Sequence, residues 1–217
     1  MRRSIAGIAL GVAVTVAVPL PAALADSGSS SLSGGTGSSS LSGGGSGSGG
    51  GGSLPSESQW ISDVTTVINS AQSYLTTALP GATKPAIVLD IDNTSLETQY
   101  SPGLITPAIP PVLALTQWAK QQGAAIIFVT GRPSLLNIYT QLNLSAVGYT
   151  VDGLYGGGLT TGSSGAGALA DYKTATRISI EQQGYTIVAN IGNSASDLSG
   201  GHAQQTFKLP DYNGALS

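Results

Sequence analysis

Cysteine is absent from this sequence of 217 residues, and charged residues make up only 9% of it. Without cysteine the chain can form no disulfide bond and can carry no lipid on a thiol. The formal net charge is −3, and a weakly acidic surface argues against a protein that binds nucleic acid. The chain therefore has to fold without covalent cross-links, and its few charged residues stand out.

The first 25 residues have the three parts of a secretory signal peptide. Arg2 and Arg3 give a positive start, residues 5–18 are mostly apolar, and residues 23–25, Ala-Leu-Ala, form a small-x-small cleavage pattern. The alternative is an uncleaved membrane anchor, but the apolar run is short for a span of about 20 residues. We expect cleavage after Ala25 and secretion to the outside of the cell or to its surface. Removal of Arg2 and Arg3 would leave 6 basic against 11 acidic residues.

Residues 26–53 are predicted to be a flexible linker. From residue 27 on they are Gly and Ser apart from Leu32, Thr36 and Leu41, and GSSSLSGG occurs twice. Such a segment cannot bury a core, and its r.m.s. end-to-end distance would be roughly 30 Å. The linker either spaces the domain from a cell surface or is a neutral low-complexity expansion. Nothing after residue 26 resembles a membrane span.

Residues 54–217 are expected to form one domain in which apolar strands alternate with helices. The segment 58–79 has apolar residues at helical spacing, which predicts an amphipathic helix that Pro80 and Gly81 end. The alternation that follows predicts an α/β fold with a Rossmann-like parallel sheet flanked by helices. The predicted strands are 86–90, 124–130, 185–192 and 206–210, and the later helices are 111–122, the segment after Pro133, and 171–183.

Polar residues follow the predicted strands at the point where each strand ends. Because the carboxyl ends of parallel strands meet at one edge of a sheet, where ligands bind, these residues are expected to lie together. The strongest pattern is PAIVLDIDNTSLE, in which Asp90 and Asp92 follow a buried strand. One carboxylate can act as a nucleophile or metal ligand while the other carries protons, although Asp-x-Asp also occurs in ordinary turns. The other residues at this edge are Thr130, Gly131, Arg132, Asn193 and Asp197.

Four segments resemble, in order, the four motifs of the haloacid dehalogenase (HAD) superfamily of phosphohydrolases. They are DIDNT at 90–94, VTGR at 129–132, the isolated Lys173 in DYKTATR, and IGNSASDL at 191–198. The leading helix followed by KPAIVLDIDNTSL is similar to the secreted acid phosphatase branch, subfamily IIIB, which includes plant acid phosphatases and vegetative storage proteins. The resemblance covers 58–212 and implies a HAD-like fold. About 35 residues separate the first motif from Thr130, which leaves no room for a large cap domain.

The resemblance implies a role for each matching residue. Asp90 would attack phosphorus and form an aspartyl-phosphate, and Asp92 would protonate the leaving alcohol and then activate water. Thr130 and Gly131 would bind the phosphoryl oxygens, and Lys173 would neutralise their charge. The physics agrees, since two carboxylates facing a phosphate dianion need cations to offset the repulsion.

The resemblance also implies a Mg²⁺ ion. Its ligands would be the Asp90 side chain, the Asp92 backbone carbonyl, and Asn193 and Asp197 in the fourth motif. Asn193 departs from the family pattern, which commonly has Asp there. An amide oxygen can coordinate a metal but brings no charge. The result is either an enzyme with weaker or retuned Mg²⁺ binding, or a site that binds phosphate compounds and turns them over poorly.

The remaining signals are weaker. Arg132 either contacts substrate or pairs with a carboxylate at the helix start. His202, the single histidine, is expected to be structural or at the surface. Asp152 is expected to be a turn residue rather than part of the pocket mouth. The segment GAGALA, 165–170, matches a dinucleotide fingerprint but follows no hydrophobic strand, so we expect a flexible loop.

The sequence therefore predicts a secreted, Mg²⁺-dependent phosphomonoesterase of the acid phosphatase type. Its partner would be a small phosphate monoester, with neither nucleic acid nor membrane involved after signal cleavage. The alternative is a non-catalytic or weakly active secreted binding or storage protein on the same fold, which Asn193 favours.

Overall fold

The computed structural model describes residues 54–161 and 165–216. The chain divides into two compact units, Met1–Gly47 and Ser48–Ser217, and every described residue belongs to the second. The predicted signal peptide, 1–25, and linker, 26–53, lie outside the described residues. Within the described part of the chain, no helix has both the length and the apolar character that a membrane crossing requires.

A five-stranded sheet forms the centre of the domain, with the strand order β3-β2-β1-β4-β5. Every neighbouring pair is parallel, as predicted. The strands β1, β2 and β4 correspond to predicted apolar runs, and their side chains alternate between the two faces of the sheet. The strands are β1 Pro85–Leu89, β2 Ala125–Pro133, β3 Gly153–Gly157, β4 Thr186–Gly192 and β5 Gln205–Lys208.

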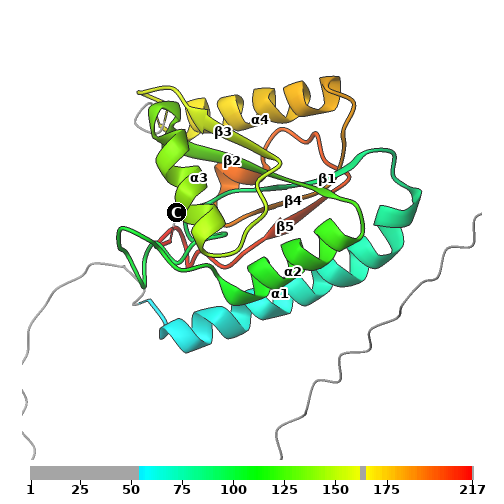
Figure 1. The fold of residues 1–217 in the computed structure, drawn as a ribbon. Helices are drawn as coiled ribbons and strands as arrows, with labels where there is room; N and C mark the ends of the chain where they lie inside the picture. The colour runs from blue at the N-terminus through cyan, green and yellow to red at the C-terminus, as the bar shows by residue number, and fades with distance from the viewer. Residues whose placement is uncertain (1–53, 162–164, 217) are drawn as a thin grey trace, which may run out of the picture. The chain divides into compact units, whose positions relative to one another are not determined.

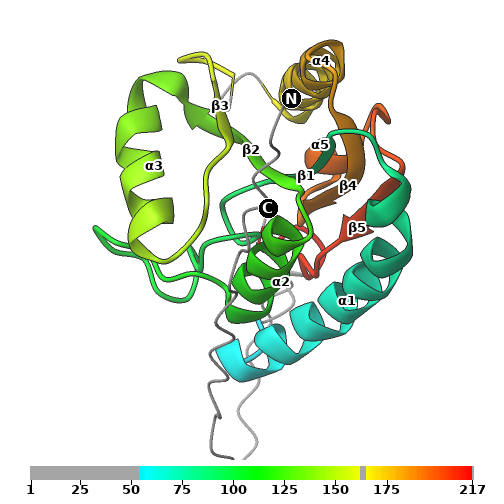
Figure 2. The ribbon, with the colours of Figure 1, turned by 45° about the vertical axis from the view of Figure 1, so that its right-hand side comes forward.

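Helices cover both faces of this sheet, as Figures 1 and 2 show. Helices α1, Glu57–Ala78, and α2, Pro110–Gln121, pack on one face, where Ile87, Leu89 and Phe128 belong to the larger core. Helix α4, Ala166–Gln182, packs on the other face against Val88 and Val129. The predicted fold class, a parallel α/β sheet flanked by helices, is confirmed.

Helix α1 contacts the core through one stripe. Ser56 caps its first turn by accepting a hydrogen bond from the Gln59 backbone N–H, and the short 3₁₀ turn Leu79–Gly81 follows its last residue. The stripe repeats every three to four residues, as one face of a helix must. Its buried members are Trp60, Val64, Ile68, Ala71 and Leu75.

One strand and the first turns of one helix were not expected from the sequence. Strand β3 lies in the glycine-rich GLYGG, which has too few apolar residues to show a strand pattern and forms a strand by pairing with β2 at the sheet edge. The predicted loop at 165–170 is wrong, because α4 begins at Ala166. Its alanines are strong helix formers, so the first turns of α4 form with little apolar patterning.

Three shorter elements complete the fold around the sheet edge. The 3₁₀ turn η2, Ser134–Leu136, and helix α3, Asn137–Ala146, follow β2 where a helix was predicted after Pro133. Helix α5, Ala195–Leu198, follows β4 directly. The turn η2 and helix α5 thus begin close to the carboxyl ends of β2 and β4.

Candidate active site

A pocket of about 230 Å³ opens at the carboxyl edge of the sheet. Asp90 and Asp92 reach it from the end of β1, and Asn193 and Asp197 reach it from the segment after β4. Lys173 comes from the middle of α4. Residues of all four motifs therefore line this one pocket, although they are up to 107 positions apart in the chain.

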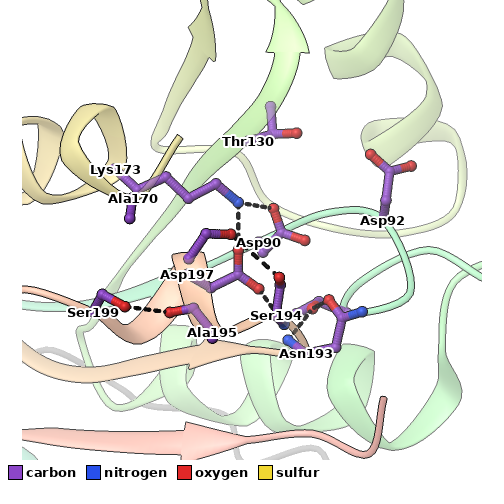
Figure 3. A network of polar contacts seen from close by, with 12 residues as sticks. Asp90, Asp92, Thr130, Ala170, Lys173, Asn193, Ser194, Ala195, Asp197 and Ser199 are labelled. Atoms are coloured by element: carbon purple, nitrogen blue, oxygen red, sulfur yellow. Dashed lines mark hydrogen bonds and ion pairs between the residues drawn. The ribbon is translucent and has the colours of Figure 1, made fainter. Parts of the chain in front are cut away.

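Lys173 joins two carboxylates that line this pocket, Asp90 and Asp197, as Figure 3 shows. Its Nζ donates to Asp90 Oδ1 at 2.6 Å and to Asp197 Oδ1 at 2.5 Å. All three side chains are buried. One ammonium thus faces two carboxylates in a region where water screens little, and the cluster carries one uncompensated negative charge when all three groups are ionised.

The pKa values of the cluster reflect this crowding. Burial raises the pKa of Asp90 to about 7, and the Asp197 charge adds to this, against the opposing effect of Lys173. Burial alone would lower the pKa of Lys173, but the two carboxylates outweigh it and raise that pKa. Lys173 is therefore held as a cation.

Asp92 is held apart from this cluster, on the far side of the pocket in Figure 3. Arg132 donates from Nε to Asp92 Oδ2 at 2.9 Å and from Nη2 to Asp92 Oδ1 at 2.6 Å. The Thr98 hydroxyl also donates to Asp92 Oδ1, at 2.8 Å. Burial would raise the pKa of Asp92, but the Arg132 hydrogen bonds and charge outweigh it and lower the pKa. Of the two roles considered for Arg132, the structure shows pairing with a carboxylate, but the partner is Asp92 after β1 and not a carboxylate at the helix start.

Asp197 is fixed by its own helix. It forms a capping box with Ser194, whose backbone N–H donates to Asp197 Oδ2 at 2.8 Å. Gly192 is required beside it, because a Cβ at that position would overlap the Asp197 side chain. The backbone carbonyl of Asp197 accepts hydrogen bonds from Asn190 and Arg177.

Arg177 is a buried residue whose supporting role the sequence analysis missed. It lies one helical turn after Lys173 on the buried face of α4 and donates to the carbonyls of Asp197, Ser199 and Gly201. The spacing of four residues from Lys173, in a chain with few basic residues, was the available signal. Arg177 fixes the backbone from which Asp197 enters the pocket.

Asn193 has both ends of its amide engaged. Its Oδ1 accepts from the Thr94 hydroxyl at 2.9 Å, and its Nδ2 donates to the Leu216 carbonyl at 2.5 Å. Asn93 donates to the same Leu216 carbonyl at 3.0 Å. We call these two contacts the Leu216 clamp, and Leu216 itself is buried and lines the pocket.

The clamp gives a structural reason for an amide, rather than a carboxylate, at position 193. A carboxylate at position 193 has no N–H and could not donate to the Leu216 carbonyl. Leu216 offers only a backbone atom here, so no sequence motif indicated that it belongs to the site.

The predicted phosphoryl-binding residues divide in two. Gly131 lines the pocket, whereas Thr130 is buried and is not among the lining residues. The Thr130 hydroxyl accepts a hydrogen bond from the Arg132 backbone N–H at 3.2 Å and so shapes the turn behind the pocket. Arg132 lines the pocket in addition.

The donor set fits a hard divalent cation. Asp90 and Asp197 approach the same Nζ, Asn193 lines the same pocket, and the cluster has an excess of negative charge. Mg²⁺ typically takes one or two carboxylates together with waters and phosphate oxygens. Among the described residues no group of three or more His, Cys, Asp or Glu side chains forms a metal site. Any metal here therefore depends on the amide and on backbone oxygens as well.

Two further residues lie away from the pocket, as expected. His202 pairs with Glu181 at 2.7 Å near the surface. Asp152 accepts hydrogen bonds from Lys120 and from the Ile126 backbone, which ties the start of β3 to β2.

The sequence from 104 to 215 matches the family described as HAD superfamily, subfamily IIIB (acid phosphatase). The chain belongs to this subfamily. The matched stretch includes Lys173, Asn193 and Asp197 but begins after Asp90 and Asp92. Asp90 and Asp92 are therefore assigned to the site by the fold and the pocket lining and not by the family match.

Two plant proteins and two bacterial structures are similar to this subfamily member. The stem 28 kDa and stem 31 kDa glycoproteins of Glycine max are each 38% identical over 108 residues, 48% of this chain. These alignments cover 42% and 36% of the two relatives, so the chain spans less than half of their length. The class C acid phosphatase of Bacillus anthracis has a TM-score of 0.53 at 22% identity, with 67% of each chain covered. Its tungstate-bound form scores 0.52 at 18% identity, and both show a shared fold.

Proposed function

We propose that this protein is a Mg²⁺-dependent acid phosphatase that hydrolyses phosphate monoesters through an aspartyl-phosphate on Asp90. The observation that supports this best is the buried cluster of Asp90, Lys173 and Asp197 in a pocket at the carboxyl edge of the sheet. A carboxylate at this position has its charge partly offset and one oxygen turned toward Lys173. Membership of an acid phosphatase subfamily points the same way.

The proposed reaction has two steps. A carboxylate oxygen of Asp90 attacks phosphorus, the bond from phosphorus to the ester oxygen breaks, and the leaving alkoxide takes a proton from Asp92. Water then attacks the acyl phosphate while Asp92 accepts its proton, which releases inorganic phosphate and restores Asp90. Lys173 and Arg132 offset the charge of the phosphoryl oxygens.

Asp92 can act as the acid only after its contact with Arg132 has changed. In the structure both Asp92 oxygens accept from Arg132, which lowers the Asp92 pKa and keeps the carboxylate ionised. A phosphate dianion is a competing bidentate partner for the guanidinium. We infer that substrate draws Arg132 toward the phosphoryl group and frees Asp92 to hold a proton.

Asp90, Asp197, the Asn193 amide oxygen and the Asp92 backbone carbonyl would hold Mg²⁺. When bound, the ion would supply Lewis-acid stabilisation of the phosphoryl charge and would balance the second carboxylate of the cluster. We further propose that the protein is exported, on the basis of the signal-like residues 1–25.

Hydrolysis of a generic aryl phosphate at mildly acidic pH tests the proposal. We expect turnover that falls on addition of a chelator and recovers when Mg²⁺ is restored. An Asp90→Asn variant is the matched control, since it keeps the side-chain shape but loses the nucleophile. The absence of turnover in the parent protein, or equal turnover in the variant, would refute the proposal that the protein is an enzyme.

The second candidate is a phosphate-binding protein that turns over poorly. Two observations favour it: Arg132 neutralises Asp92, and the Asn193 amide holds the Leu216 clamp instead of bringing charge to a metal. If calorimetry shows tight binding of phosphate and the assay shows no hydrolysis at any Mg²⁺ concentration, the phosphate-binding protein is the correct alternative.

A further inference from the structure

A second pocket, of about 320 Å³, lies next to the first and shares Arg132 with it. It is formed between the loop 98–106 and the segment from η2 to α3. Among the described residues that line it, Arg132 is the only charged one. The apolar lining comes mainly from Pro102, Leu136 and Tyr139. This space is here called the side pocket.

Several polar groups that line the side pocket already form hydrogen bonds within the protein. The Asn143 amide pairs with both the N–H and the carbonyl of Thr106, at 3.0 and 2.9 Å. The Tyr139 hydroxyl donates to the Leu104 carbonyl, and the Thr98 hydroxyl donates to Asp92. A ligand there meets a mostly apolar wall on which several polar groups already have partners within the protein, so burial of apolar surface would dominate its binding.

Asp92 lies at the boundary between the two pockets. It lines the first pocket, and its hydrogen-bond partners Thr98 and Arg132 both line the side pocket. A general acid must reach the ester oxygen that leaves with the alcohol. The leaving group is therefore expected on the Asp92 side of phosphorus, and the side pocket is the space on that side.

We propose that the side pocket binds the leaving alcohol of the substrate and selects monoesters whose alcohol is apolar, alkyl or aryl. This inference rests on the proposed phosphatase function. A cavity of 150 Å³ suffices for benzene, so 320 Å³ accommodates an aromatic ring or a six-carbon chain. With Arg132 as its only charged lining residue, and that residue facing the phosphoryl group, the side pocket does not suit alcohols that carry further phosphates or many hydroxyls.

A homologous series of alkyl phosphates tests this without changing the chemistry of the leaving group. We expect kcat/KM to rise up to about fourfold per added methylene from ethyl to hexyl phosphate. Glycerol 3-phosphate, whose alcohol is polar, is expected to resemble ethyl phosphate. Equal kcat/KM values for ethyl, hexyl and glycerol phosphates would overturn the proposal.

Two neighbouring leucines of η2 provide matched variants. Leu136 lines the side pocket and its exposed fraction is 43%, whereas Leu135 is 64% exposed and does not line it. Leu136→Ser is expected to lower the hexyl-to-ethyl ratio of kcat/KM at least threefold, and Leu135→Ser is expected to leave the ratio unchanged. An unchanged ratio in Leu136→Ser, or an equal fall in both variants, would show that the side pocket does not hold the alcohol.

Binding separates this proposal from the phosphatase proposal. In the Asp90→Asn protein, calorimetry with hexyl and ethyl phosphates measures the pocket without turnover. Tighter hexyl binding that Leu136→Ser abolishes supports the side pocket even if the parent protein hydrolyses nothing. Hydrolysis in the parent without any preference for hexyl phosphate would leave the phosphatase proposal standing and reject the side pocket.

Discussion

At the scale of single residues, the two basic side chains of the pocket have different surroundings. Lys173 is buried between two carboxylates, whereas Arg132 is partly exposed and holds Asp92, whose side chain is 39% exposed. The cost of removing each charge should therefore appear in different measurements.

Lys173→Met should destabilise the fold. The variant leaves Asp90 and Asp197 buried without a cation, which costs about 3–5 kcal/mol when a buried pair is broken. Lys120→Met is the matched control, because Lys120 pairs with Asp152 in a half-exposed bridge that contributes below about 1 kcal/mol. Urea unfolding measures both. A similar loss in the two variants would contradict the burial argument.

Arg132→Gln should act on substrate binding. The variant removes one of the two basic side chains proposed to offset the charge of the phosphate dianion, and a lost charged hydrogen bond predicts a KM about tenfold or more higher. Steady-state kinetics with an aryl phosphate separates KM from kcat. A higher kcat at unchanged KM would mean instead that Arg132 only restrains Asp92.

At the scale of elements, the Leu216 clamp connects the segment after β4 to the loop after β1. Asn193→Asp should remove the donor to the buried Leu216 carbonyl and lower the unfolding free energy by about 1–3 kcal/mol in chelator. Added Mg²⁺ should stabilise this variant more than the parent, because the new carboxylate strengthens cation binding to the native state. Thermal unfolding with and without Mg²⁺ checks both, and equal Mg²⁺ effects in the two proteins would place residue 193 away from the metal.

The start of helix α1 faces the loop after the first motif through two acidic residues. Burial, together with the Glu57 charge, raises the pKa of Glu97 above its ordinary 4.5. The native state therefore holds this proton more tightly than the unfolded state, and stability falls as pH rises through the raised value. Tyr100 stacks on Trp60 at the same junction, with ring centroids 4.8 Å apart.

Glu97→Gln removes this loss. The variant should match the parent below pH 4.5 and become the more stable protein as the pH rises toward neutrality, as followed by urea unfolding across pH. Glu57→Gln should give a smaller change in the same direction, since it removes only the neighbouring charge. A uniform destabilisation of Glu97→Gln at every pH would mean that its carboxylate makes an essential contact.

At the scale of the whole molecule, we expect the domain to be independent of the glycine-rich segment. Residues 26–53 have too few apolar residues to form a core. A protein that begins at Ser48 should therefore keep the unfolding midpoint of the protein that begins at Asp26, and its rate of aryl phosphate hydrolysis. Calorimetry and the same assay compare the two. A lower midpoint in the shorter protein would show that the segment packs on the domain.

The sequence predicted the parts of the fold whose pattern is local. Strands β1, β2 and β4 are apolar runs, and Asp90, Lys173 and Asp197 lie where the topology of a parallel sheet puts its ligands. Strand β3 could not be predicted, because its glycines carry no pattern and its partner strand supplies the order.

The contacts that decide the chemistry were less accessible from the sequence. The pairing of Arg132 with Asp92 spans 40 residues, and it reverses the raised pKa that an acid role requires. The Leu216 clamp uses a backbone carbonyl, which every residue has and no motif marks. Both depend on how loops pack at the sheet edge rather than on residue type.

The Leu216 clamp can form only late in synthesis of the chain. Asn93 and Leu216 are 123 residues apart, and at ordinary rates of synthesis that interval takes roughly 6–25 s. Asp90 is made 83 residues before Lys173, so its carboxylate stays without its cation while β1 and β2 are already available to pair. A growing chain thus passes through a stage that has much of the sheet but no complete pocket. The pocket is therefore completed late, once Leu216 has been made.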